Sequence, residues 1–273
     1  MKPKMLKLND SIERILVISD VHSFLEPLKE FERYVAKLPG RSQVVVGGDL
    51  FLGGTKPLET LDWVRKNSGE FVVMGNHDEN VLKKIPPGDY PVYTEEGAAQ
   101  RLSAAQKNYL KQFPAKLEVK WREKTIRFLH GHRDLNGKIV GADSWQSKPA
   151  ELLARYGDPK IALTVLGHTH FSFVRQEGNI LLADSGSACL TINAVRKKKG
   201  EIISQDDADR PLSSDIRSSF LSITERQGKL LVEIIRFDYN RQTALEELIQ
   251  AGLPAHKIEH LKEWLSQGIY QLF

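Results

Sequence analysis

Short apolar runs separated by amphipathic segments make up the first part of the chain. The runs 15–18, 44–46 and 71–74 are rich in β-branched residues, which is typical of buried strands. Between them, apolar residues at steps of three or four predict a helix over 25–38 and a second helix that begins at Pro57. Strands and helices that alternate with short connections predict parallel strands and an α/β architecture.

Later segments follow other periods. Runs 117–121 and 125–129 alternate with period two and predict a hairpin, and so do 171–174 with 180–183 and 219–224 with 230–237. A further strand is predicted at 161–166, with helices at 103–113 and 150–155 and two more in the tail. Because no linker or internal repeat divides the chain, we expect one domain over 1–273, with a core of about 12–240 and a helical tail of 241–273.

Polar side chains that bind metals or move protons follow several of the predicted strands. The carboxyl ends of parallel strands meet at one edge of a sheet, where α/β proteins bind their ligands. We therefore expect one site to contain Asp20, His22, Asp49, Asn76, His77, Asp78, His130, His168 and His170.

Seven of these residues are candidate metal ligands: Asp20, His22, Asp49, Asn76, His130, His168 and His170. Two carboxylates, four imidazoles and one amide are too many for one ion and suit two. Mixed nitrogen and oxygen donors favour Mn²⁺, Fe²⁺/Fe³⁺ or Zn²⁺ over Ca²⁺ and Mg²⁺. One aspartate would bridge ions about 3.5–4 Å apart, and a hydroxide shared by the ions would attack phosphorus.

His77 lies among the candidate ligands in the sequence but has no clear place in that set. It is the natural candidate for the general acid that protonates the leaving alkoxide. A histidine that only orients a ligand would look the same in sequence.

Five blocks stand in order along the chain, each after a predicted strand. Together they resemble the signature of the calcineurin-like metallophosphoesterases, and segments 102–117, 184–187 and 238–254 resemble the stand-alone bacterial and archaeal phosphodiesterase branch. The blocks are Asp20-Val21-His22, Gly48-Asp49, Gly75-Asn76-His77-Asp78, His130-Gly131 and Gly167-His168-Thr169-His170.

This resemblance implies a fold and a role for each residue. The fold would be a sandwich of two mixed β-sheets flanked by helices, with parallel βαβ units. The resemblance assigns Asp20, His22 and His170 to the first metal and Asn76, His130 and His168 to the second, with Asp49 as the bridge and His77 as the acid.

At two positions the chain differs from related families, and the first difference limits which activities we expect. In protein serine/threonine phosphatases and bis-nucleoside tetraphosphate hydrolases, the block after the second strand resembles Gly-Asp-x-x-Asp/Asn-Arg-Gly. In this chain, Leu52 stands in place of the acidic residue and Gly53 in place of the arginine. This argues against both activities. It also removes the usual partner of His77, and we expect Asp78 or another group to orient that ring instead. A second departure is Asp184, where the branch normally has asparagine.

Bulk properties add little to this picture. The chain has 273 residues, 41% hydrophobic and 27% charged, with one cysteine, Cys189. This composition fits an ordinary globular protein of a reducing compartment, and we expect a cytoplasmic protein with no membrane segment. The net charge of +4 is compatible with anionic substrates. The basic run 196–199 favours a solvated loop, so nucleic acid is a possible but not a favoured partner.

The sequence therefore predicts a metal-dependent phosphoesterase that acts on small phosphodiesters, and possibly also on monoesters. The alternatives are a non-catalytic scaffold that binds proteins and a nuclease. The oligomeric state is open. His132 either touches substrate or faces solvent, and His256 and His260 are expected to be surface residues rather than a metal pair.

Overall fold

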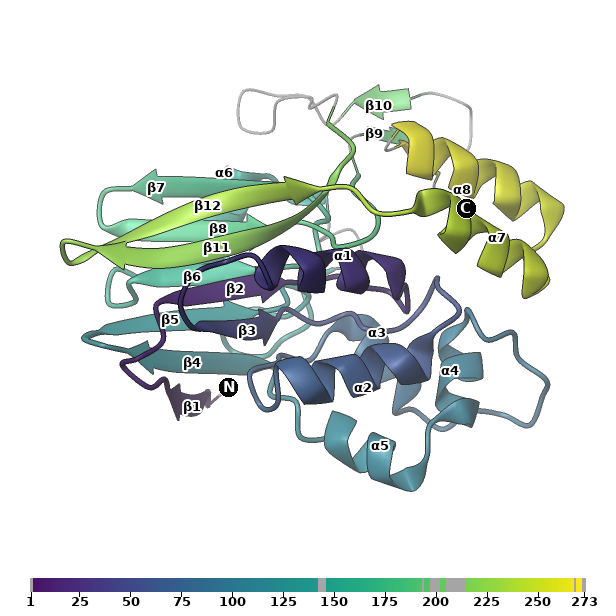
Figure 1. The fold of residues 1–273 in the computed structure, drawn as a ribbon, viewed down its shortest axis with the longest axis horizontal. Helices are drawn as coiled ribbons and strands as arrows, with labels where there is room; N and C mark the ends of the chain where they lie inside the picture. Colours follow the sequence, from purple (N-terminus) through teal and green to yellow (C-terminus); the bar gives the residue numbers. More distant parts are fainter. Residues whose placement is uncertain are drawn as a thin grey trace.

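Two mixed β-sheets pack face to face, with helices on their outer faces (Figure 1). The computed structural model describes residues 2–141, 146–192, 194–196, 202–204, 215–267 and 269–271. The lysines at 197–199 and the acidic residues at 206, 207 and 209 lie outside this range. The two-sheet sandwich with flanking helices that was expected from the sequence is confirmed.

The larger sheet has the strand order β1-β4-β5-β6-β8-β7. Its central strands β5, β6 and β8 run parallel, whereas β4–β5 and β7–β8 are antiparallel hairpins, and β1 adds a parallel edge to β4. The strands are β1 (Lys4–Lys7), β4 (Lys116–Trp121), β5 (Lys124–Leu129), β6 (Leu163–Leu166), β7 (Ser172–Glu177) and β8 (Ile180–Ser185).

The smaller sheet has the order β12-β11-β2-β3. Strands β2 and β3 are parallel and are joined through a helix, as the sequence predicts, while β11 is antiparallel to both of its neighbours. These strands are β2 (Arg14–Ile18), β3 (Ser42–Val46), β11 (Ser218–Arg226) and β12 (Lys229–Phe237). A short third sheet joins β9 (Ala194–Arg196), β10 (Ile202–Ser204) and β13 (Ile269–Gln271).

Strands β2 and β3 are buried on both faces, which explains their unbroken apolar sequences. Val17 and Val45 point into the space between the sheets, where Trp121 and Phe128 of the larger sheet meet them. Their neighbours on the other face, such as Ile18, pack instead against the helices. The helices are α1 (Glu26–Val35), α2 (Pro57–Asn67), α3 (Asn76–Val81), α4 (Glu95–Arg101), α5 (Ala104–Leu110), α6 (Pro149–Tyr156), α7 (Arg241–Gln250) and α8 (Ala255–Gln267).

Residues 71–74 were expected to form a third strand, and they do not. They make one isolated parallel bridge, between Val46 and Val72, at the edge of the smaller sheet. The next hydrogen bond leaves the sheet, because Met74 N donates to the carbonyl of Pro114. The chain then turns directly into α3. Helices α3 and α4 and strand β1 are too short to give a clear periodic signal, and the sequence analysis missed all three.

The two tail helices are confirmed. They pack over the end of the sandwich through Leu245, Leu248 and Leu265, whereas Ile249 stays exposed. Across the described ranges, no helix combines the length and apolar character that crossing a bilayer requires.

Candidate metal centre and active site

The seven proposed ligands lie where strands of both sheets end, and five of them line one cleft: His22, Asp49, Asn76, His168 and His170. Asp20 and His22 follow β2 and Asp49 follows β3, while the histidines follow β5 and β6 of the facing sheet. Asn76 is the first residue of α3. The centre therefore joins the two halves of the sandwich, a geometry that the order of motifs alone does not reveal.

The potential ligand atoms fall into two groups, each within 4.8 Å. In the first group, His170 Nε2 lies 3.1 Å from His22 Nε2 and 3.4 Å from Asp20 Oδ1. The second group combines Asp49, His130 and His168. There His130 Nε2 lies 3.0 Å from Asp49 Oδ2 and 3.2 Å from Asn76 Oδ1.

Three of the imidazole rings are held in one orientation by the backbone. Each places its Nδ1 within 2.6–3.0 Å of a carbonyl oxygen and directs Nε2 at the other ligands. Donation of the Nδ1 proton to a carbonyl leaves a lone pair on Nε2, which is the form that binds a metal. The pairs are His22 with Phe51, His130 with Gly47 and His170 with Leu190.

Asp20 and Asp49 are buried carboxylates whose neighbours are mainly histidines. Burial raises the pKa of Asp20, but the charge and hydrogen bond of His170, together with the charge of His130, outweigh burial and lower it to about 2. For Asp49, burial also raises the pKa, and His130 and His77 together bring it well below its usual value. Among the described residues no Lys or Arg makes an ion pair with either group. Buried charges need partners, so the donor set fits divalent cations.

The same buried environment shifts the pKa values of the histidine rings. Burial lowers the pKa of His22 to about 4 and that of His168 to about 3, which keeps both imidazoles neutral and able to ligate. His130 differs from them. Burial lowers its pKa, but Asp49 outweighs burial and raises it to about 10.

The backbone at the centre is in an unusual conformation. Five of the seven proposed ligands have positive φ angles of 51–73°, a region that non-glycine residues rarely adopt. Such conformations cost of order 1–3 kcal/mol each and gather at functional sites. The five are Asp20, His22, Asp49, His168 and His170.

Glycines bring the ligand loops into close contact. A Cβ on Gly75 would stand 2.1 Å from Asp49 Oδ1, and one on Gly48 would stand 2.8 Å from Gly75 N. The φ of Gly75 is −92°, which any residue can adopt, so glycine is needed here to leave space for the carboxylate of Asp49.

The expectation that Asp78 orients His77 is wrong. The Asp78 carboxylate instead accepts hydrogen bonds from Asp49 N, Leu50 N and Gly75 N at 2.8–3.0 Å. Burial and the charge of Asp49 raise the pKa of Asp78 to about 7. Asp78 therefore fixes the backbone that carries Asp49.

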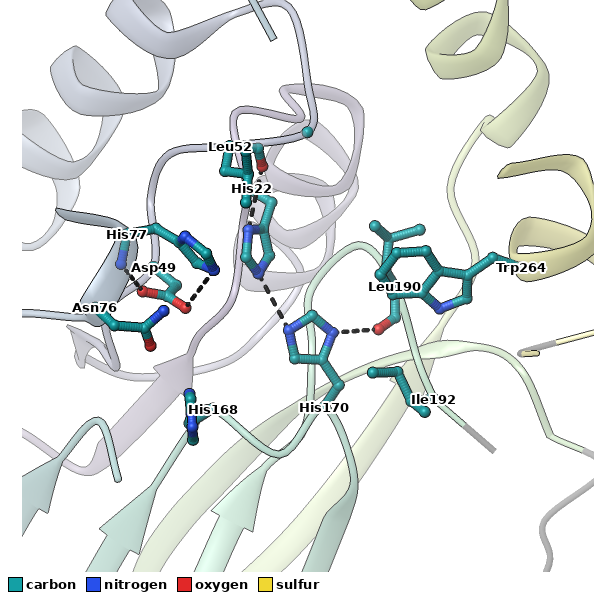
Figure 2. A pocket seen from close by; sticks show the side chains of 11 residues that line it. His22, Asp49, Leu52, Asn76, His77, His168, His170, Leu190, Ile192 and Trp264 are labelled. Carbon is teal, nitrogen blue, oxygen red and sulfur yellow. Dashed lines mark hydrogen bonds and ion pairs between the residues drawn. The ribbon is translucent and has the colours of Figure 1, made fainter. Parts of the chain in front are cut away.

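Glu95, the first residue of α4, is the partner of His77. Its Oε1 lies within hydrogen-bond distance of His77 Nδ1 and also accepts from Asn80 Nδ2 at 2.8 Å. Burial lowers the pKa of His77, but the charges of Asp49 and Glu95 outweigh burial and raise it. His77 Nε2 is left facing the cleft, 3.8 Å from Asp49 Oδ2 (Figure 2). The sequence analysis missed Glu95, since only the capping pattern after Thr94 marks that segment.

The loop after β8 supports the ligand-bearing turns from behind. Asp184 Oδ2 accepts a hydrogen bond from Thr169 Oγ1 at 2.9 Å, and Ser187 Oγ donates to the carbonyl of Asp20 at 3.0 Å. The departure from the usual asparagine at Asp184 therefore places a carboxylate under the loop that carries His168 and His170.

Comparison with known proteins identifies the family. The family model described as "Calcineurin-like phosphoesterase superfamily domain" matches residues 14–202. The chain belongs to the calcineurin-like phosphoesterase superfamily. The resemblance found in the sequence is confirmed.

Individual relatives of this phosphoesterase-superfamily chain are distant. A symmetrical bis(5'-nucleosyl)-tetraphosphatase of Chromobacterium violaceum is 27% identical over 119 residues, which are 43% of this chain and 40% of that protein. A metallophosphoesterase from Sphaerobacter thermophilus shares the fold with a TM-score of 0.66, at 19% identity, over 94% of this chain and 99% of that one. A hypothetical protein from Pyrococcus horikoshii gives the same TM-score at 13% identity, over 93% and 98%.

The cleft of this superfamily member measures about 350 Å³. On one side lie Asp49, Asn76 and His77, and on the other lie Leu190, Ile192 and Trp264, with His22 and His170 between them (Figure 2). Trp264 reaches this cleft from α8, and no motif in the sequence marks it as a residue of the site.

Three further histidines lie outside the set of proposed ligands and the general acid. His132 is buried beside the second group, with Nε2 3.3 Å from Glu79 Oε1, so the solvent-facing alternative is wrong. His132 is also not among the described residues that line the cleft. His256 and His260 pack against each other on α8 and belong to neither group of potential ligands.

Proposed function

We propose that the protein is a hydrolase of phosphodiesters that uses two divalent transition-metal ions. The observation that carries this proposal is a set of two carboxylates and four imidazoles whose ligand atoms form two groups, with Asn76 Oδ1 3.2 Å from His130 Nε2. Among the described residues, no Lys or Arg makes an ion pair with either carboxylate. We assign Asp20, His22 and His170 to one ion and Asn76, His130 and His168 to the other, with Asp49 between them. When bound, such ions lower the pKa of water for attack on phosphorus and neutralise phosphoryl oxygens.

The chain's own contribution to the reaction is to position groups and deliver a proton. His77 Nε2 faces the cleft, and its Nδ1 is held by Glu95, so the ring can donate a proton from Nε2 to a leaving oxygen. Asp78 keeps the backbone of Asp49 in place through its contacts with three N–H groups.

The charge of the cleft favours diesters over monoesters. A monoester carries one more negative charge than a diester at neutral pH, and enzymes often hold that charge with Arg or Lys. Among the described residues that line the cleft there is no Lys or Arg.

Hydrolysis of bis-nucleoside tetraphosphates is a second candidate, favoured by the Chromobacterium violaceum relative. Leu52 and Gly53 weigh against it. The Leu52 carbonyl lies 3.1 Å from His22 Nδ1, and Gly53 lines the cleft where an arginine could otherwise reach phosphate. The non-catalytic scaffold is less supported, because six of the proposed ligands form two groups of potential metal-binding atoms. The nuclease is less supported, because no Lys or Arg is among the described residues that line the cleft.

The test is turnover of bis(p-nitrophenyl) phosphate with Mn²⁺, Fe²⁺, Co²⁺ or Zn²⁺, together with metal analysis of the purified protein. We expect activity in the wild type, a severe loss in Asp49→Ala, and a smaller loss in His77→Ala, because p-nitrophenolate leaves without a general acid. His256→Ala, which changes an exposed histidine on α8, is the matched control and should retain activity. Absence of wild-type turnover with all four metals would refute the proposal, and diadenosine tetraphosphate in the same panel tests the second candidate.

A further inference from the structure

A second cavity of about 320 Å³ lies beside the metal cleft, under the tail helices. Its walls come from segments far apart in the chain: the turn after β2, the segment before α4, the loop at Leu190 and helices α7 and α8. Its side chains belong largely to the apolar cluster that fixes the tail to the body. A cavity of this size falls at the lower end of the range for small-molecule sites.

The two cavities share a wall. Leu52, Gly53, Leu190 and Trp264 line both of them. Trp264 is held in place, because its Nε1 donates to the carbonyl of Thr191 at 3.0 Å and its ring lies nearly parallel to that of His170, at 6.1 Å between centroids. The second cavity is therefore directly adjacent to the metal centre, on the far side of Trp264.

The second cavity suits an aromatic group. Phe24, Tyr93 and Trp264 contribute rings, and Leu248, Leu253 and Leu261 contribute aliphatic side chains. Flat rings gain from both the burial of apolar area and the contact with other rings. We propose that this cavity is a specificity subsite for an aromatic group on the substrate, either an aryl ring or a nucleobase.

The position of His77 indicates which part of the substrate enters the subsite. Figure 2 shows His77 on the opposite side of His22 and His170 from Trp264. A general acid must lie beside the leaving oxygen. The aromatic group in the subsite is consequently the ester substituent that remains on the product phosphate. This step rests on the proposed function.

The first test compares diesters that share the p-nitrophenolate leaving group and differ in the retained group: methyl, phenyl or thymidine-5'-yl. We expect kcat/KM to be about tenfold or more higher for phenyl than for methyl. A further gain with thymidine would indicate a nucleobase, and an equal or smaller value would indicate an aryl ester. Equal kcat/KM for methyl and phenyl would overturn the subsite while leaving the phosphodiesterase in place.

Variants that fill the cavity provide the second test. Leu261→Trp on α8 and Leu253→Trp between the helices should each bring the phenyl-to-methyl ratio towards one. Ile249→Trp, at an exposed position on α7 outside the lining, is the matched control and should keep the wild-type ratio. A wild-type ratio in both filled variants, with thermal unfolding that confirms folded protein, would contradict the proposal.

A binding measurement separates this inference from the proposed function. Phenylphosphonate and methylphosphonate carry the same head group, and calorimetry on the Mn²⁺-loaded protein measures their affinities without turnover. Tighter binding of phenylphosphonate, lost in Leu261→Trp, would support the subsite even if no diester were hydrolysed. Equal affinities would count against it.

Discussion

The metal centre and the cavity under the tail helices share a wall, but they are built in opposite ways. The centre consists of buried polar atoms on turns that follow strands of both sheets, and most of its ligands have positive φ angles. The cavity is lined mainly by apolar side chains, several of them on two helices that pack on the end of the body, together with Thr94, Lys257 and His260. Substitutions in the metal centre should therefore be poorly tolerated. Substitutions in the cavity can change its shape as long as its lining stays largely apolar.

This difference indicates that the two regions have separate roles in the reaction. In the centre, each ligand depends on a specific partner, such as the carbonyl of Gly47 for His130 or the N–H of His77 for Asp49. In the cavity, packing by size and apolar character is enough. We infer that the centre determines the reaction and the cavity determines which substrate reaches it. The following predictions test that division.

The largest effect is expected at Asp49. Replacement by alanine removes the proposed bridging carboxylate and the acceptor of the His77 backbone N–H. We expect kcat/KM for bis(p-nitrophenyl) phosphate to fall roughly 10³-fold or more, together with the metal content. Steady-state kinetics and metal analysis of the same preparation measure both. Full metal content with near-normal activity would exclude the bridging role.

His77→Ala should have the next largest effect, and its size should depend on the leaving group. Loss of a general acid costs roughly 10²–10⁴-fold when the leaving group is an alcohol. The loss should be much smaller for p-nitrophenolate, which leaves without help. Kinetics with paired alkyl and p-nitrophenyl diesters measure this difference. An equal loss for both classes would mean that His77 only supports the ligands.

The Glu95→Gln variant tests the partner of His77. Loss of the carboxylate should weaken the orientation of the His77 ring. We expect kcat for an alkyl diester to fall roughly tenfold, with little change in stability or metal content. Glu96→Gln, at the adjacent position, is the control and should behave as the wild type. No change in kcat for Glu95→Gln would mean that the contact does not serve the reaction.

Asp78→Asn should act mainly on stability. An amide cannot accept from all three backbone N–H groups that the carboxylate holds, and an unsatisfied buried group costs about 1–3 kcal/mol. Denaturant unfolding measures this change. Unchanged stability would contradict the backbone-holding role.

The smallest effect on the metal centre is expected from Leu265→Ala. Leu265 is buried in the tail cluster and lines neither cavity. Its loss should cost about 2–5 kcal/mol of local packing, so hydrogen exchange should rise in α7 and α8 while β2 and β3 stay protected. Metal content should not change. A uniform rise in exchange across all elements would show that the two regions unfold as one.

The sequence alone determined the strands and the residues that follow them. Buried strands such as β2 and β3 are recognisable because both faces are apolar, and glycines and polar residues mark where they end. Six of the seven proposed ligands follow such strands, and Asn76 follows the apolar run 71–74, so their selection as candidates follows from local patterns. The family resemblance follows from the same blocks.

Only the tertiary structure decided which side chains serve those ligands. Glu95 lies 18 residues from His77 on a short helix without a clear periodic signal, and Asp78 is next to His77 in sequence but points at the backbone of Asp49, Leu50 and Gly75. Trp264 reaches the cleft from the tail, where it bonds to Thr191 across 73 residues. Contacts of this kind depend on how sheets and helices pack in space, and no local pattern of residues encodes that packing.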